Sequence, residues 1–262
     1  MKKLLILSIA LTTAFMASAQ QPQRTPASGP GQDPPRMVPG MTEIWDPEVK
    51  IIQPGVTDRE APSDAIVLFN GTDITAEWTD QRGNPSKWVI QDGALVCVKG
   101  SGVIKTKRKF GNVQLHIEWK SPSEVQGNSQ GRGNSGVYLQ ELYEVQVLDS
   151  YDNRTYRHGQ AGSLYKQFAP LVNASRKPGE WQSYDIIFTQ PTFSSDSTTY
   201  YTPPRVTVLH NGVLIQNNVS LRGPTQYIGI PEYTIKVHGP GSLVLQDHGN
   251  PVAYRNIWIR EL

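Results

Sequence analysis

The sequence of 262 residues contains a single cysteine, so no disulfide can form within the chain. This residue, Cys97, lies in the alternating run 94–98, a pattern that predicts a strand packed against a core. We therefore interpret Cys97 as a buried, small apolar side chain. Without cross-links, stability has to come from apolar burial within a large domain, and about 200 residues suffice for that.

The sequence also lacks a large excess of charge of one sign. Its formal net charge is +2, and its densest basic run, Lys105–Lys109, is typical of a solvated strand end. Proteins that bind nucleic acid usually carry a broad basic surface, so we do not expect nucleic acid as a partner.

No apolar run is long enough to span a bilayer. The longest, residues 4–16, follows two lysines and precedes Ala17-Ser18-Ala19, which is the pattern of a secretory signal peptide over residues 1–19. No cysteine occupies the cleavage site, so we expect no lipid anchor and no membrane partner. The sequence thus predicts a periplasmic or secreted protein that begins near Gln20.

Helical periodicity is scarce as well. Residues 20–62 are rich in Pro, Gly and Gln and read as a leader or linker, whereas residues 63–262 carry short alternating runs separated by turn residues. Asp92-Gly93 and Asn211-Gly212 are typical of turns between paired strands. The spacing of these runs predicts an all-β domain, a sandwich of two antiparallel sheets with jelly-roll connections.

The segment Glu144–Asp149 combines polar side chains with a strand pattern. Its two valines share one face, so Glu144 and Gln146 must share the other. Asp149 falls on the valine side unless the strand bulges near Leu148. A carboxylate is costly to cover without a partner, and we therefore expect the face of Glu144 to line a wet cleft.

Three further segments are expected to meet this strand. Gln246 and His248 share a face by alternation and would point into the same cleft. The run 115–120 places Glu118 on one side of a strand, as a further acid. The glycine-rich run Gly131–Gly136 would form a flexible rim with exposed amides.

The sequence resembles the 3-keto-disaccharide hydrolase domain family over about residues 65–262. The matching motifs are Leu68-Phe69-Asn70-Gly71, Asn134-Ser135-Gly136-Val137-Tyr138, Glu144-Val145-Gln146-Val147-Leu148-Asp149, Gly179-Glu180-Trp181, Leu245-Gln246-Asp247-His248-Gly249 and Tyr254-Arg255-Asn256-Ile257. The resemblance implies a concanavalin A-like jelly roll that acts on glycosides oxidised to a ketone at sugar carbon 3. The strand at 144–149 is also similar to the Glu-x-Asp-x-x-Glu strand of retaining glucanases, but here Gln146 and Asp149 replace the second and third acids.

A ketone at carbon 3 acidifies the hydrogen on carbon 2, so a single base can start elimination of the group on carbon 1. Addition of water to the product gives net hydrolysis. Glu144 or His248 is our predicted proton-transfer residue. Asp149 and Glu118 would complete an acid pair or hold a divalent metal ion as a cofactor.

The remaining candidates would bind the carbohydrate. Gln146 and Gln246 are expected to bind sugar hydroxyls, Arg132 or Asn134 to steady the oxyanion, and Tyr138 and Tyr165 to stack on a sugar ring.

Each assignment has an alternative. His248 could be a structural histidine at a strand end, and Glu118 could pair with Lys120 or Arg132. The alternatives for the whole domain are a lectin-like carbohydrate-binding module, and a retaining glucanase that uses Glu144 and Asp149.

Overall fold

The computed structural model describes residues 36–196, 198–228 and 235–262. The predicted signal peptide lies outside these residues. A compact unit spans Ile51–Leu262, and a second unit spans Met1–Lys50, in which the described part holds one 3₁₀ turn, η1 (Pro39–Met41). Residues 51–62, which we expected in the leader, thus belong to the compact unit. Among the described residues, no helix has the length and apolar character to cross a membrane.

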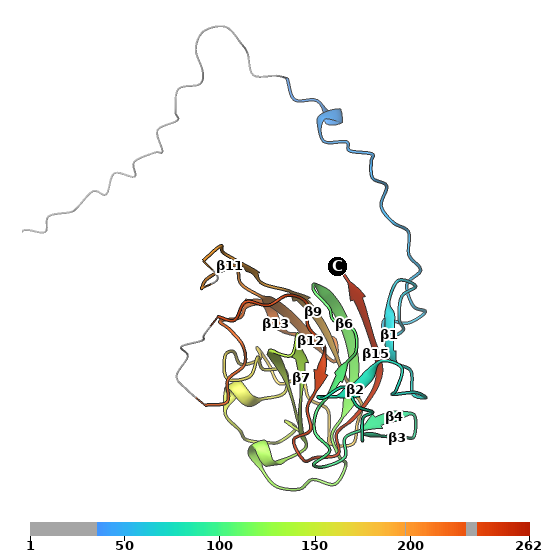
Figure 1. Ribbon diagram of the computed structural model, residues 1–262, viewed down its shortest axis with the longest axis vertical. Coiled ribbons are helices and arrows are strands. Elements are labelled where there is room, and N and C mark those ends of the chain that lie inside the picture. The colour runs from blue at the N-terminus through green and yellow to red at the C-terminus, as the bar shows by residue number, and fades with distance from the viewer. Residues whose placement is uncertain (1–35, 197, 229–234) are drawn as a thin grey trace, which may run out of the picture. The chain divides into compact units, whose positions relative to one another are not determined.

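The larger sheet has eight antiparallel strands and is strongly curved (Figure 1). Its order is β13-β12-β9-β6-β15-β4-β3, with β1 paired to β15. These strands are β1 (Ile66–Phe69), β3 (Val89–Gln91), β4 (Ala94–Val96), β6 (Val113–Lys120), β9 (Gln182–Thr189), β12 (Arg205–His210), β13 (Val213–Ser220) and β15 (Ala253–Glu261).

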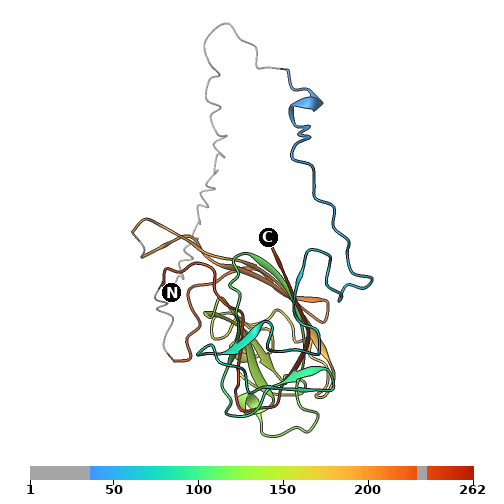
Figure 2. The ribbon, with the colours of Figure 1, turned by 45° about the vertical axis from the view of Figure 1, so that its right-hand side comes forward.

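The smaller sheet has five antiparallel strands in the order β2-β5-β14-β7-β8. They are β2 (Trp78–Asp80), β5 (Ile104–Thr106), β7 (Asn134–Leu139), β8 (Tyr143–Leu148) and β14 (Val244–Leu245). A separate hairpin, β10 (Thr192–Phe193) with β11 (Tyr200–Thr202), extends away from the sandwich in both views (Figures 1 and 2). Short 3₁₀ turns, η2 (Ser129–Gly131) and η3 (Arg157–Gly159), lie in the loops. The predicted jelly-roll β-sandwich is confirmed.

The core between the sheets follows the two-residue period of the strands. Val145 and Val147 of β8 are fully buried in the core cluster, as are Leu115 and Ile117 of β6. Side chains that alternate with them must point away from the core. The polar positions of β8 and β6 therefore lie on opposite outer faces of the sandwich, and this placement decides which candidate residues can meet.

Candidate functional site

A cavity of about 370 Å³ lies on the outer face of the five-stranded sheet, a volume within the usual range for small-molecule sites. The strands β7 and β8 supply its floor, and the loop that follows β14 supplies one wall. Tyr138 lies directly across from Glu144 in the β7–β8 pair, and Val244 of β14 lies across from Tyr138. The lining residues are Gln130, Asn134, Tyr138, Glu144, Gln146, Tyr165, Thr225, Tyr227, Gln246 and His248.

Glu144 is the buried acid of this cavity, since only 4% of the residue is exposed. The ion pairs among the described residues do not include it. Burial raises the pKa of Glu144 to about 7, and a hydrogen bond from Tyr138 opposes this rise only in part. Near neutral pH this carboxyl group therefore exchanges a proton readily, as a general base requires.

Gly136 makes room for the Glu144 carboxylate. A Cβ at position 136 would collide with Glu144 Oε1 and crowd the Tyr138 ring. Gly136 sits across from Gln146 in the β7–β8 register, so the absent side chain opens the space between two cross-strand neighbours. The space left by Gly136 thus accommodates the Glu144 carboxylate at the cavity lining.

Gln146 links the acid to the far wall of the cavity. In one orientation its amide nitrogen donates to Gln130 Oε1 at 3.1 Å. With the amide turned over, the nitrogen lies 3.0 Å from Glu144 Oε1 and 3.1 Å from the carbonyl oxygen of Ser135. A donor at this position favours the ionised form of Glu144.

The wall formed by β14 and the loop after it carries two predicted residues. Gln246 Nε2 donates to the Tyr138 hydroxyl at 3.3 Å, and His248 is exposed at the cavity lining. Asn134 also lines the cavity and is held by a 2.8 Å bond from its Nδ2 to the carbonyl oxygen of Gln130. The structure therefore brings together Glu144, Gln146 and the two residues of this wall, as the alternation predicted.

Asp149 and Arg132 lie outside the cavity lining. The β7–β8 register runs from Leu139–Tyr143 to Asn134–Leu148 without a bulge, so Asp149 stays on the side of the valines. It forms a 2.5 Å ion pair with Arg132, whose Nη1 also donates to the carbonyl oxygen of Tyr151 at 3.1 Å. Burial raises the pKa of Asp149, while Arg132 opposes this. The pair holds the loop after β8, and the expected convergence of Asp149 with Glu144 does not occur.

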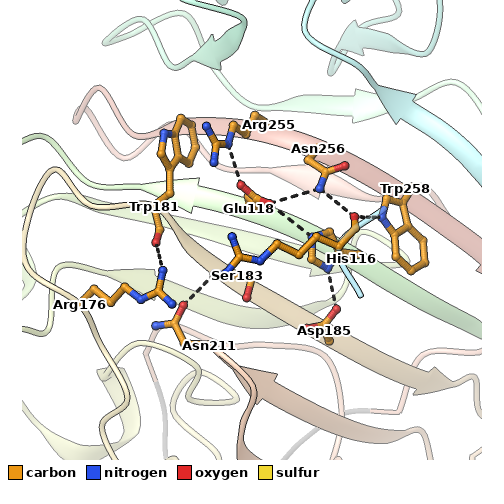
Figure 3. A network of polar contacts seen from close by, with 11 residues as sticks. His116, Glu118, Arg176, Trp181, Ser183, Asp185, Asn211, Arg255, Asn256 and Trp258 are labelled. Carbon is orange, nitrogen blue, oxygen red and sulfur yellow. Dashed lines mark hydrogen bonds and ion pairs between the residues drawn. The ribbon is translucent and has the colours of Figure 1, made fainter. Parts of the chain in front are cut away.

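Glu118 lies on the other outer face, because β6 belongs to the eight-stranded sheet. It accepts hydrogen bonds from Arg255 Nε (2.6 Å) and Asn256 Nδ2 (3.2 Å), and His116 Nε2 is 3.9 Å away (Figure 3). Although burial opposes the change, these partners lower the pKa of Glu118 to about 2. Glu118 is thus an ion-paired carboxylate on the outer face of the larger sheet. The prediction that it lies beside Glu144 was wrong.

His116 completes this second cluster. Its Nδ1 lies 2.6 Å from Asp185 Oδ1, and its ring stacks on Trp258 with centroids 5.2 Å apart (Figure 3). Burial acts to lower the pKa of His116, but the carboxylates of Asp185 and Glu118, which favour the charged imidazolium, outweigh it and raise the pKa overall. The two acids suggested as metal ligands, Glu118 and Asp149, are on different sides of the core, and the described residues contain no group of three or more His, Cys, Asp or Glu arranged to hold a metal ion.

Sequence patterns did not identify three lining residues, Gln130, Thr225 and Tyr227. They lie in loops, where no alternation marks the direction of a side chain. Thr225 accepts a 2.9 Å hydrogen bond from the backbone N–H of Glu144 through its Oγ1, although 81 residues separate the two. The fold, rather than a local motif, brings these loops to the cavity.

Comparisons with known proteins agree with this architecture. Residues 64–260 match the model of a family described as the 3-keto-alpha-glucoside-1,2-lyase-like domain. A 3-keto-disaccharide hydrolase from Bacteroides thetaiotaomicron is 28% identical over 223 residues, which cover 68% of this chain and 71% of that protein.

Two solved structures from Parabacteroides distasonis, both assigned provisionally to the glycosyl hydrolases, are similar as well. The first is 48% identical with a TM-score of 0.81, and the match covers 88% of this chain and 100% of that one. The second is 21% identical with a TM-score of 0.55, covers 81% of this chain and 100% of that one, and shares the fold.

Proposed function

The chain belongs to the 3-keto-alpha-glucoside-1,2-lyase-like family, and from this membership and the cavity we propose that it cleaves 3-keto-glycosides, with Glu144 as the base. It is a glycoside-acting enzyme with a carbohydrate substrate. The observation that carries the proposed mechanism is that Glu144 is the one carboxyl group among the described lining residues. It is buried without an ion pair, its pKa is about 7, and amides, hydroxyls and rings make up the rest of that lining.

The first step is proton abstraction next to the ketone. Glu144 takes the proton from carbon 2, and the electron pair of that C–H bond moves into the enolate of the carbon 3 ketone. The cost of removing this proton falls because the ketone stabilises the resulting anion. The amide of Gln146 lies beside the carboxylate and keeps it available in the ionised form.

The second step breaks the bond between carbon 1 and the leaving oxygen. The enolate electrons form a double bond between carbons 1 and 2, the ketone is restored, and the departing oxygen takes a proton. We assign delivery of that proton to His248, whose imidazole lies in the cavity lining and can donate a ring N–H. Addition of water across the double bond, with hydroxyl on carbon 1 and hydrogen on carbon 2, gives net hydrolysis.

A double-displacement mechanism with two carboxylates receives less support. It requires two acids that face each other across the bond to be cleaved. Here the second acid of the strand, Asp149, does not line the cavity and is paired with Arg132. A lining whose described residues include one acid suits proton abstraction, for which no nucleophile is needed.

Matched substrates test the proposed function. The purified protein is incubated with a 3-keto-glucoside and with the same glucoside before oxidation, each with and without a chelator, and products are measured by mass spectrometry. We expect turnover of the keto compound only. Cleavage of both substrates would instead identify a glucanase, and binding without turnover a lectin-like module. Loss of turnover in the presence of chelator would show a metal requirement.

The signal peptide predicted from the sequence supports a proposal for the compartment in which the reaction takes place. We propose that the enzyme acts in the periplasm or outside the cell, on glycosides that have already been oxidised. Fractionation of cells that express the full chain, with N-terminal sequencing of the product, checks this assignment.

A further inference from the structure

One side of the cavity mouth is both aromatic and basic. The side chain of Lys166 places its ammonium group 4.4 Å from the ring centroid of Tyr156, 5.7 Å from that of Tyr165 and 5.6 Å from that of Tyr227. Tyr165 and Tyr227 line the cavity, and the hydroxyls of Tyr156 and Tyr165 are joined by a 2.7 Å hydrogen bond. The lysine is therefore held beside the entrance by contacts with three rings.

The same loop carries further positive charge. Arg154, Arg157 and Lys166 are all exposed, and none of them takes part in the ion pairs found in the described part of the chain. The acid nearest in sequence, Asp152, is exposed as well. Arg255 on the opposite outer face, by contrast, pairs with the carboxylate of Glu118. Unpaired cations around exposed rings attract anions and planar groups.

The inner part of the cavity has the opposite character. Among the residues that the structure describes, its lining holds one acid, Glu144, beside neutral amides, a set suited to a neutral sugar with many hydroxyls. A glycoside bound with its oxidised sugar above Glu144 must extend its aglycone toward the mouth.

We infer that the rim of Tyr156, Tyr165, Lys166 and Tyr227 is the aglycone subsite and that it selects planar aglycones with a negatively charged substituent, such as a carboxylated aromatic ring. The inference rests on the proposed function, because it presumes that the oxidised sugar occupies the floor. The tyrosine rings stack on the planar group, while the ammonium of Lys166 pairs with the charge. Lys166 acts here as a specificity residue and takes no part in proton transfer.

Binding and turnover test the inference separately. Calorimetry compares unoxidised 4-carboxyphenyl α-glucoside with its neutral isostere, 4-(hydroxymethyl)phenyl α-glucoside, on the full-length mature protein. We expect about fivefold tighter binding of the carboxylate, the scale of one exposed ion pair. Lys166→Met should remove this difference, Lys166→Arg should restore it, and Lys177→Met, which changes an exposed lysine elsewhere, should leave it intact.

Turnover of the 3-keto forms of the same pair is then measured. We expect Lys166→Met to raise KM for the carboxylated substrate about fivefold, with kcat and the neutral substrate unaffected. Equal affinity for both glucosides in the wild type, or a preference that survives in Lys166→Met, overturns the inference. A charge preference in binding with no turnover of either keto compound would instead reject the proposed function and leave a subsite for anionic aryl glucosides.

Discussion

Glu144 and Glu118 occupy equivalent positions on the two outer faces of the sandwich, and their surroundings differ in one respect. Each lies on a strand, alternates with core residues and is 4% exposed. Glu118 has Arg255, Asn256 and His116 around its oxygens, whereas Glu144 has hydroxyl and amide groups and, within the described part of the chain, no cationic partner. The pKa is about 2 for the first and about 7 for the second.

This difference distinguishes a carboxylate with a structural role from one suited to proton transfer. A carboxylate with a cationic partner stays ionised at every physiological pH, so it can bind but cannot exchange protons in a catalytic cycle. A carboxylate buried without a cation costs folding free energy, and proteins keep such groups where chemistry needs them. Burial alone therefore does not distinguish the two, and the nature of the partner does.

The same substitution on the two faces should give opposite results for activity. Glu144→Gln removes the proposed base while it keeps shape, and we expect kcat on a 3-keto-glucoside to fall about 10²- to 10⁴-fold. Glu118→Gln should leave kcat within about twofold, because its side chain does not reach the cavity. Steady-state kinetics of both variants check this. Near-normal turnover by Glu144→Gln would remove Glu144 from the mechanism.

For the free energy of unfolding we expect the reverse: Glu118→Gln should have the larger effect and Glu144→Gln the smaller one. Glu118→Gln leaves Arg255 without its carboxylate, and we expect a loss of about 2 kcal/mol in the free energy of unfolding, below the range for fully buried pairs because the Arg255 side chain is 40% exposed. Glu144→Gln should be neutral or stabilising at pH 8, since an unpaired buried charge disappears. Urea unfolding at that pH measures both. A destabilised Glu144→Gln variant would mean that its carboxylate has a stabilising partner.

The contributions of Glu144 and Glu118 to stability should also depend on pH with opposite signs. The pKa of Glu144 is raised from its ordinary value of 4.5 to about 7, so its protonated form favours folding. This contribution, about 3 kcal/mol at most, is fully present below pH 4.5 and is lost as the pH rises through 7. For Glu118 the stabilising contribution is present above pH 4.5 and is lost as the pH falls toward 2.

Unfolding curves of the two Gln variants between pH 3 and 8, read against the wild type, separate these contributions. Activity follows the ionised base, so kcat/KM should rise with pH through about 7. A profile that is flat between pH 5 and 8 would argue against proton abstraction by Glu144.

The sequence predicted the outer face of the smaller sheet well, because alternation fixes direction within a strand. The valines of β8 and the leucines around β14 placed Glu144, Gln146, Gln246 and His248 together, and the structure confirms that they line one cavity. The placement of Glu118 failed for a different reason. Alternation gives a face of a strand, but it does not give the sheet to which the strand belongs, and β6 lies in the other sheet.

The positions of residues in loops could not be predicted from such patterns. The direction of Asp149 depended on whether a bulge exists, and only the hydrogen-bond register answers that question. Thr225 and Tyr227 reach the cavity through a connection between sheets, and Lys166 reaches the rim in a backbone conformation with φ of 63°. No periodic signal encodes these positions.

The smallest expected effect concerns the space beside Glu144. In Gly136→Ala the new methyl group would occupy the place of Glu144 Oε1, so the carboxylate has to rotate away from Tyr138. Position 136 has no left-handed backbone angle, and the change therefore acts through contact and not through strain. We expect kcat to fall about tenfold, as for a base displaced by a fraction of an ångström. The pH midpoint of kcat/KM should fall as well, because the displaced carboxyl group is better hydrated.

A matched control is Gly212→Ala at the turn between β12 and β13, where nothing lies within 4 Å of an added Cβ. This glycine has a φ of 79°, so the substitution strains the turn and lowers stability by about 1 kcal/mol, while the pH midpoint stays that of the wild type. The two alanines thus separate loss of stability from displacement of the base. An unchanged pH midpoint in Gly136→Ala would mean that Glu144 keeps its buried position without the space beside it, and that the unpaired environment of this acid depends on the loops above the sheet alone.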